Sequence, residues 1–314
     1  MDNSSRIFIA DINSFIGGAI YRALKREGYS NIIPEPPNEP DLRDKETVNN
    51  FFAHKKPEYV FLAAGKSAGI MGNIKYPAEL MLDNLLVECN VIDSAYRHGV
   101  KKLLYLASNC CYPRNCPQPM KESYLLTGPL EPTNEPYAVA KITGIKLCQS
   151  YRSQFAANDI CGIPANSFGP HDDFGIDDSH VVGALMRKIH EAKKINLKEV
   201  ILLGTGKPRR EFMYIEELAD ACIFIMQKYE EIEPINIGPG GEVSIGQLAI
   251  MMKEIIGFEG TLIYDTSKPD GMPIKLLDTK KLTDLGWKPF VNFKDALTKT
   301  YSWYVNALSS NRDK

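Results

Sequence analysis

A tyrosine and a lysine four residues apart, Tyr137 and Lys141, are the pair in this sequence with the clearest capacity for chemistry. On a helix, this spacing places both side chains on one face. A neighbouring ammonium stabilises a phenolate and lowers the pKa of the tyrosine, so Tyr137 would exchange a proton with a substrate oxygen near neutral pH. The spacing alone is weak evidence, because Tyr21 and Lys25 share it and are expected to form a half-exposed surface pair.

Ser108 ends an apolar run about thirty residues before Tyr137, which is the separation expected for a strand, a loop and the next helix. Ligands of parallel α/β sheets bind beyond the carboxyl ends of the strands. The Ser108 hydroxyl would then hydrogen-bond a substrate carbonyl oxygen and help Tyr137 to polarise it. A serine at a strand end is also a common turn former or helix cap, so both interpretations stay open.

Two different patterns divide the chain. In the first half, short apolar runs alternate with helical periodicity, which predicts an α/β fold of the Rossmann type, a doubly wound parallel sheet in residues 1–169 that binds a dinucleotide. Residues 170–314 are predicted to form mainly a smaller C-terminal α/β substrate lobe, with some elements returning to the main sheet. The expected strands are 6–10, 31–33, 59–63, 102–107, 159–164, 200–203, 234–237 and 261–264; the expected helices are 16–27, 45–53, 78–98, 138–155, 180–192, 215–228, 245–256 and 293–305.

Composition excludes several classes of protein. A net charge of -2 over 314 residues, without a basic stripe, argues against nucleic acid as a partner. The seven cysteines are scattered and lack zinc-site spacing, so we expect reduced thiols and no metal site. No signal peptide and no long uncharged apolar run is apparent, which predicts a soluble cytoplasmic protein without membrane contact.

Eight ordered motifs along nearly the whole chain resemble those of the GDP-L-fucose synthase family, in the extended short-chain dehydrogenase/reductase superfamily. Together they are far more specific than any one of them. The motifs are Ala63-Ala-Gly-Lys66, Tyr76-Pro-Ala78, Ser108-Asn-Cys-Cys-Tyr-Pro113, Leu130-Glu-Pro-Thr-Asn-Glu-Pro-Tyr-Ala-Val-Ala-Lys141, Gly169-Pro-His-Asp-Asp-Phe174, Asp178-Ser-His180, Gly206-Lys-Pro-Arg-Arg-Glu-Phe212 and Ser267-Lys-Pro-Asp-Gly271.

The resemblance implies an epimerase and reductase that acts on a GDP-4-keto-sugar. Ser108, Tyr137 and Lys141 match the reductase triad, while Cys110 and His180 match the pair that epimerises carbons 3 and 5. The 4-keto group acidifies the protons on both neighbouring carbons, so a thiolate and an imidazole can remove and return them through an enediolate. A nicotinamide would then reduce the ketone. From residue type alone, Cys110 is equally a small buried hydrophobe and His180 an ordinary residue at a helix start.

Substrate and cofactor contacts also follow from the resemblance. Arg210 and Lys188 match cations near the substrate diphosphate, although Lys188 is also typical of a solvated helix face, and Leu203 stands where the family often has an aromatic residue against the base. The implied cofactor is NADP or NAD. Its contacts would be Asn13, Gly17, Glu35, Ala63, Ala64, Tyr137, Lys141, Pro164, Asn166 and His180.

The phosphate-binding loop departs from the family pattern. Aligned on Gly17, the first two glycine positions hold Asp11 and Ser14, so side chains stand where backbone should approach the pyrophosphate. No arginine follows the second strand to hold a 2'-phosphate. Glu35 there is placed to bind an unphosphorylated ribose, or is a loop glutamate in water. We therefore expect poor NADPH binding and a preference for NAD(H).

Two classes of function remain. One is an active enzyme on a GDP-keto-hexose or a heptose relative, with both activities or only one of them. The other is a catalytically silent nucleotide-sugar-binding partner with a degraded cofactor site. Retention of Ser108, Cys110, Tyr137, Lys141 and His180 together favours catalysis. Enzymes of this fold often form homodimers through a four-helix contact, here residues 78–98 and 138–155.

Overall fold

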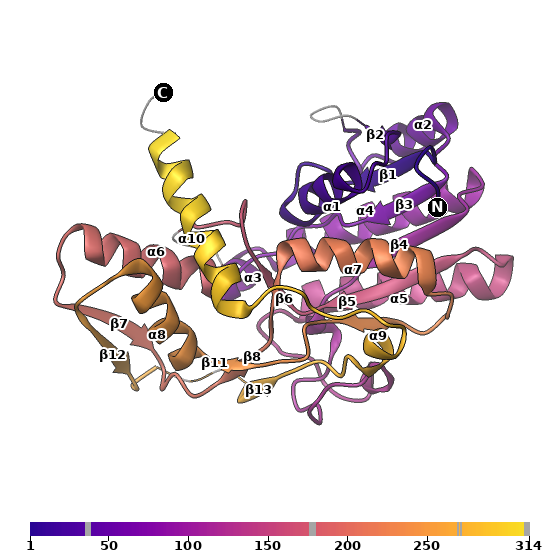
Figure 1. Ribbon diagram of the computed structural model, residues 1–314. Coiled ribbons are helices and arrows are strands. Elements are labelled where there is room, and N and C mark those ends of the chain that lie inside the picture. The colour runs from indigo at the N-terminus through magenta and orange to yellow at the C-terminus, as the bar shows by residue number, and fades with distance from the viewer. Residues whose placement is uncertain (35–38, 176–179, 269, 271, 311–314) are drawn as a thin grey trace.

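The computed structural model describes residues 1–34, 39–175, 180–268, 270 and 272–310 (Figure 1). Its strands are β1 (Ile7–Ala10), β2 (Ile32–Ile33), β3 (Tyr59–Leu62), β4 (Lys102–Leu106), β5 (Asp159–Pro164), β6 (Asn166–Phe168), β7 (Glu199–Leu203), β8 (Arg209–Arg210), β9 (Phe212–Tyr214), β10 (Ile235–Ile237), β11 (Val243–Ser244), β12 (Thr261–Asp265) and β13 (Ile274–Lys275). Its helices are α1 (Phe15–Arg26), α2 (Lys45–Lys55), α3 (Ile70–Lys75), α4 (Pro77–Arg97), α5 (Glu135–Phe155), α6 (Val181–Lys194), α7 (Ile215–Lys228), α8 (Ile245–Ile256), α9 (Lys280–Asp284) and α10 (Phe293–Ser310), with 3₁₀ turns η1 (Asn109–Cys111) and η2 (Glu122–Tyr124).

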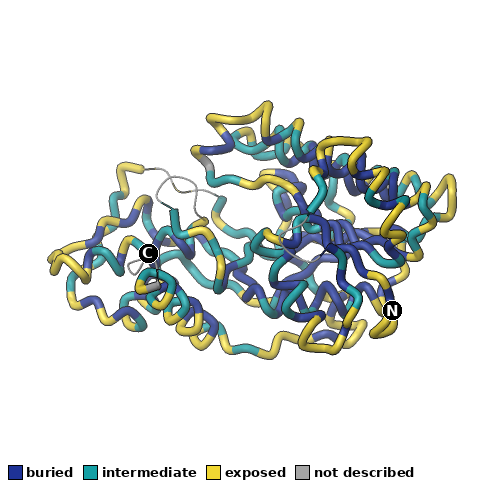
Figure 2. Tube along the Cα trace, turned by 90° about the horizontal axis from the view of Figure 1, so that it is seen from above, coloured by how far each residue is buried: buried dark blue, intermediate teal, exposed yellow. Residues whose placement is uncertain are grey.

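A parallel sheet of six strands, in the order β10-β5-β4-β3-β1-β2, organises the described residues. Every residue of β1, β4 and β5 is buried, which explains why these segments read as unbroken apolar runs instead of alternating. Helix α1 packs with α7, and α4 packs with α2 and α5. Figure 2 shows the buried residues gathered along these strands, and the exposed ones on outer helices and loops. The predicted Rossmann-type fold is confirmed.

The second half of the chain contributes to both parts of the molecule (Figure 1). Strand β10 pairs with β5 in the main sheet, as the sequence suggested, and α7 packs against α1. The remaining strands form small sheets, β11-β8-β13, β12-β7 and β6-β9, with α6, α8 and α10 nearby. The short strands β6, β8, β9, β11 and β13 were not predicted, because two or three residues carry no readable period. A domain division at residue 169 stays a prediction.

None of the described helices combines the length and the apolar character needed to cross a membrane.

Candidate active site

The carboxyl end of β4 presents the first candidate residues. Ser108 precedes the 3₁₀ turn η1, and its hydroxyl oxygen accepts a hydrogen bond from the Cys110 backbone N–H at 3.2 Å. The same side chain hydrogen-bonds Tyr137 on α5. Ser108 therefore caps a turn, as one of its two sequence interpretations expected, and it also contacts Tyr137. A hydrogen bond from Ser108 to a substrate oxygen stays a prediction.

Cys110 is half-buried, and two nitrogen donors approach its sulfur. Asn134 is the N-cap residue of α5 but makes no capping hydrogen bond; its amide Nδ2 instead donates to Cys110 Sγ at 3.1 Å. The Lys275 ammonium, on β13, lies 3.6 Å from the same sulfur. An amide donor and a cation both favour negative charge on sulfur, so this environment suits a thiolate that exchanges protons with carbon.

The adjacent Cys111 is a control within the structure. It is fully buried, and burial raises the pKa of its thiol to about 12. Its sulfur lies 3.9 Å from the Ala138 carbonyl oxygen. All seven cysteines are free, and five of them are buried, as expected of small hydrophobes. Residue type cannot separate Cys110 from Cys111, but their surroundings do.

Cys110 opens into a cavity of about 650 Å³ between the two halves of the chain. One wall comes from the segments after β4 and before α5, and the other from β8 and the approach to β13. This volume is in the range of small-molecule sites. Its lining residues are Asn109, Cys110, Tyr112, Pro113, Arg114, Asn115, Met120, Glu131, Thr133, Asn134, Asn166, Arg210, Asp270, Met272, Pro273 and Lys275.

Lys141 is held by an acid that the sequence did not reveal. Its Nζ lies 3.1 Å from Glu88 Oε1 on α4, and the side chains are only 5% and 1% exposed. The Tyr105 hydroxyl donates to the same Oε1 at 2.7 Å. By contrast, the exposed Lys25 lies over the Tyr21 ring, 5.7 Å from its centroid, as expected of a surface pair. The same four-residue spacing thus gives a buried ionic network in one helix and a surface contact in the other.

The expectation that Lys141 lowers the pKa of Tyr137 is wrong for this structure. Burial raises the pKa of the Tyr137 phenol well above its usual value, and the hydrogen bond with Ser108 opposes that rise only in part. The main physical reason is burial, and the neighbouring Cys110, Cys111 and Glu88 add smaller contributions in the same direction. The Glu88 carboxylate also pairs with the Lys141 ammonium.

The remaining substrate candidates are spread over the second half. Arg210 lines the Cys110 cavity, and its Nη1 donates to the Met272 carbonyl oxygen at 2.6 Å. Lys188 is exposed on α6 and donates to the Ile201 carbonyl oxygen at 2.5 Å, while Leu203 is 66% exposed at the end of β7. His180 is the exposed N-cap residue of α6 and makes no capping hydrogen bond with its side chain. Among the described residues it does not line the cavity of Cys110.

The loop after β1 keeps its turn despite the missing glycines. Asp11 has a φ of 65°, in the left-handed region that aspartate tolerates better than most residues. Ser14 caps α1: its oxygen accepts from the Gly17 N–H at 3.1 Å and its hydroxyl donates to the Asp11 carbonyl oxygen at 2.7 Å. A Cβ at Gly17 would lie 2.1 Å from that carbonyl oxygen, so only glycine fits. The strand, turn and helix start fit a dinucleotide pyrophosphate, which Gly17 and the first turn of α1 would hold.

The other cofactor candidates surround this loop and the end of β3. Ala63 and Ala64 follow β3, and Ala64 lines a second cavity of about 280 Å³ with Asp11 and Glu39. Asn13 is exposed in the turn, Pro164 is buried at the end of β5, and Asn166 accepts a hydrogen bond from Asn109 Nδ2 at 3.2 Å. Glu35, the candidate ribose ligand, lies outside the described residues. No group of three or more His, Cys, Asp or Glu side chains suited to a metal ion occurs in the described part of the chain.

Comparison with known proteins identifies the family of the chain. Residues 7–238 match the profile of the NAD dependent epimerase/dehydratase family. The chain is 50% identical to GDP-L-fucose synthase 1 of Arabidopsis thaliana over 97% of its length and 94% of that protein. It belongs to the GDP-L-fucose synthase family. The predicted family and its enzymatic character are therefore confirmed, and members of the wider family use NAD(P).

Two solved structures from Campylobacter jejuni have the same architecture over nearly the full chain. A GDP-6-OMe-4-keto-L-xylo-heptose reductase superposes with a TM-score of 0.92 at 34% identity, covering 98% of this chain and 99% of that one. A GDP-mannoheptose C4 reductase with NADP bound gives a TM-score of 0.88 at 36% identity, covering 97% and 99%.

Sequence reasoning missed four residues that the fold brings to these sites: Glu88, Asn134, Lys275 and Glu39. Asn134 lies within a motif that resembles the family and Lys275 lies near another, so the sequence marks both segments. Nothing in their spacing indicates that both side chains contact the Cys110 sulfur. Glu88 stands four residues after Asn84 on α4, and both are fully buried, which is unusual for such polar side chains. Two buried polar residues at helical spacing are a signal that could have found Glu88.

Proposed function

We propose that this enzyme converts a GDP-4-keto-6-deoxy-hexose, or a related GDP-keto-sugar, by epimerisation at carbons 3 and 5 and reduction of the 4-keto group with NAD(P)H. The observation that carries the proposal is the position of Cys110. Its sulfur meets Asn134 and Lys275 in a cavity of about 650 Å³, immediately after the serine that contacts Tyr137. Among the described residues, Ser108 and Tyr137 do not line this cavity themselves, so the proposal requires the keto-sugar to reach from Cys110 toward the adjacent Ser108 and Tyr137.

In the epimerase half, Cys110 removes a proton from a carbon next to the ketone. The C–H bond breaks, an S–H bond forms, and the electron pair moves to the carbonyl oxygen to give an enolate. A proton returned to the opposite face by a second acid inverts the carbon and restores the ketone. Lys275 and Asn134 favour the thiolate that removes the first proton. We assign the second proton-transfer role to His180 on the strength of the family resemblance.

In the reductase half, a bound nicotinamide supplies hydride to carbon 4. Tyr137 donates the phenolic proton to the oxygen, with Ser108 polarising the same carbonyl through its hydroxyl. The high pKa of the Tyr137 phenol keeps the proton in place until the alkoxide forms, which suits an acid in the reduction direction. Lys141, fixed by Glu88, lies one helical turn away.

For the nucleotide, we propose that Arg210 and Lys188 hold the diphosphate, with Leu203 toward the base. Arg210 is half-buried and lines the cavity beside Asp270, whereas Lys188 reaches a backbone carbonyl on β7. The Campylobacter jejuni neighbours are named for GDP-heptoses, which favours a GDP-keto-heptose as the second candidate substrate. Of the two nicotinamide cofactors, we propose NADH as the preferred reductant.

We also propose a homodimer that works in the cytoplasm. Helices α4 and α5 pack together and leave large apolar side chains exposed: Leu82, Leu86, Tyr96 and Phe155. Such a patch fits pairing with the same helices of a second copy. The seven free thiols fit a reducing compartment.

The test is incubation of the purified enzyme with GDP-4-keto-6-deoxymannose in deuterated buffer, with NADH or NADPH added in separate reactions. Mass spectrometry should show deuterium at two ring carbons, and a reduced product should form only when cofactor is present. Deuterium exchange without reduction of the ketone would identify an enzyme that only epimerises. Reduction without deuterium exchange would identify an enzyme that only reduces. If neither occurs with the hexose or with a GDP-4-keto-heptose, the catalytic proposal is wrong and a binding role replaces it.

A further inference from the structure

The cavity of about 280 Å³ beyond β1 and β3 has an unusual charge content for a site that meets a phosphorylated cofactor. Its lining includes four carboxyl groups, Asp11, Glu39, Asp41 and Asp83, and two cations, Arg43 and Lys66. It lies at the carboxyl ends of parallel strands, where a Rossmann-type sheet binds the adenosine half of a dinucleotide. The charges on its wall therefore face the ribose and any phosphate on it.

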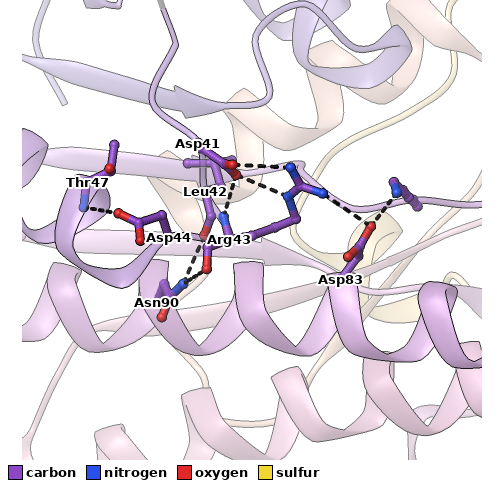
Figure 3. A network of polar contacts seen from close by, with 8 residues as sticks. Asp41, Leu42, Arg43, Asp44, Thr47, Asp83 and Asn90 are labelled. Carbon is purple, nitrogen blue, oxygen red and sulfur yellow. Dashed lines mark hydrogen bonds and ion pairs between the residues drawn. The ribbon is translucent and has the colours of Figure 1, made fainter.

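Both cations of this cavity are already engaged. The Arg43 guanidinium donates to both carboxylate oxygens of Asp41, from Nε and Nη2 at 3.1 Å each, and its Nη1 lies 3.8 Å from Asp83 (Figure 3). Lys66 forms an ion pair with Asp83. The residues around them are also fixed, because Asn90 on α4 donates to the Leu42 and Arg43 carbonyl oxygens. These carboxylates offset much of the positive charge that a 2'-phosphate would otherwise meet at this cavity.

Glu39 has no such counter-charge within the described part of the chain. Its carboxyl Oε1 accepts a hydrogen bond from the Asp11 backbone N–H, at the first position of the phosphate-binding loop. In NAD-binding Rossmann folds, an acid beside this loop accepts hydrogen bonds from the ribose hydroxyls. Glu39 holds its carboxyl group in that position through a contact with the loop itself.

We propose that Glu39 determines cofactor selectivity in this enzyme: its carboxylate binds the 2'-hydroxyl of NAD(H) and excludes the 2'-phosphate of NADP(H). The inference rests on the proposed use of a nicotinamide cofactor and names the residue that selects between the two forms. It assigns to Glu39 the role for which sequence position indicated Glu35.

The setting makes this selectivity dependent on pH. Burial raises the pKa of Glu39 to about 7, with the nearby Asp11 carboxyl acting in the same direction. The other charged groups on the cavity wall are Asp41, Arg43, Lys66 and Asp83, which pair with one another. Above pH 7 Glu39 is charged and repels the 2'-phosphate. Below pH 7 it takes a proton, and its repulsion of NADP(H) is lost.

The experiment measures dissociation constants of NADH and NADPH by calorimetry, at pH 6 and pH 8.5, for the parent and for Glu39→Gln. Glu46→Gln, on the exposed first turn of α2, is the matched control for loss of a carboxylate. Melting temperatures check that each variant is folded. A 2'-phosphate gains its own second negative charge near pH 6, so NADPH binding depends on pH even without Glu39. The effect of Glu39 is therefore taken as the difference between the parent and Glu39→Gln at each pH.

We expect the parent to bind NADH at least about tenfold more tightly than NADPH at pH 8.5. Glu39→Gln should reduce this ratio severalfold at pH 8.5 and change it little at pH 6, while Glu46→Gln should match the parent. Equal or tighter NADPH binding by the parent, an unchanged ratio in Glu39→Gln, or binding of neither dinucleotide would each overturn the proposal. An enzyme that epimerises and reduces its sugar with NADPH would overturn it while leaving the proposed function intact.

Discussion

At the carboxyl end of β4 two side-chain nitrogens contact a sulfur atom, whereas at the carboxyl end of β1 a backbone N–H of the loop contacts a carboxyl group. Around Cys110, an amide and an ammonium favour negative charge. Around Glu39, burial and Asp11 disfavour it. The environment of Cys110 fits a thiol that must lose its proton to act as a base. The environment of Glu39 fits a carboxyl group whose charge depends on pH.

The two regions also relate differently to the family pattern. The first retains the serine, cysteine, tyrosine and lysine of the family motifs, whereas the second replaces two loop glycines by Asp11 and Ser14 and yet preserves the turn. Sugar chemistry and cofactor choice depend on the carboxyl ends of different strands. The cofactor preference can therefore change while the sugar chemistry is kept. The following experiments test whether the two regions act independently.

The largest effect is expected from Cys110→Ala. Removing the thiol that exchanges protons with carbon should slow deuterium entry from solvent by about 10³-fold or more, at the ring carbon that Cys110 serves. The measurement is mass spectrometry of the sugar in deuterated buffer. Cys111→Ala, one residue away, should retain exchange once its melting temperature shows that it is folded. Undiminished exchange in Cys110→Ala would remove this residue from the mechanism.

Tyr137→Phe should separate the two half-reactions. The variant keeps the ring but loses the proton donor, so hydride transfer should fall by about 10²-fold or more while ring-proton exchange continues. Cofactor oxidation followed by absorbance and deuterium uptake followed by mass spectrometry report on the two halves. Parental rates in both assays would show that Tyr137 is not the acid.

A smaller effect is expected from Lys275, which links the second half of the chain to the Cys110 sulfur. Lys275→Met should slow deuterium exchange roughly tenfold, since a tenfold change corresponds to about 1.4 kcal/mol, well within the energy of a close charge pair. Lys275→Arg should recover most of that loss because it keeps the positive charge. Alkylation of Cys110 by iodoacetamide in the folded protein, without substrate, should slow in parallel with the deuterium exchange. The extent of alkylation is measured after digestion, on the peptide that contains Cys110. A merely structural lysine would leave the alkylation rate unchanged.

How much the sequence predicted differs between these regions. The sheet and its long helices were predictable because buried parallel strands leave apolar runs and helices leave a 3.6-residue period. Tyr137 and Lys141 were predictable as a pair because both lie on one helix, one turn apart. The ion pair of Lys141 with Glu88 depends on how α4 packs against α5. The polar residues Asn84 and Glu88 at helical spacing mark Glu88 as unusual, but nothing local identifies Lys141 as its partner.

The cofactor region shows a second limit of prediction from the sequence. The sequence predicted that Asp11 breaks the fingerprint, but not that its backbone would adopt the left-handed turn at φ 65° and offer its N–H to Glu39. The role expected of Glu35 rested on counting about twenty residues from the loop. Such counting locates a segment and cannot choose among the acids within it.

The smallest effect is expected where the loop meets the pyrophosphate. In the double variant Asp11→Gly, Ser14→Gly, the first substitution keeps the φ of 65° at no steric cost and removes a carboxyl group whose pKa burial has raised, and the second lets backbone approach the phosphate. Binding of NADH and NADPH should tighten severalfold at pH 8, by calorimetry. Asp11→Asn is the matched variant, because it removes the charge but keeps the side chain. If Asp11→Asn alone gives the whole gain in affinity, charge repulsion by Asp11 was the obstacle to binding. If only the double glycine variant gives it, the obstacle was poor access of the pyrophosphate to the backbone. Weaker binding by the double variant would mean that Asp11 and the Ser14 cap help to form the site, and the loop would then be an adapted binding element instead of a degraded one.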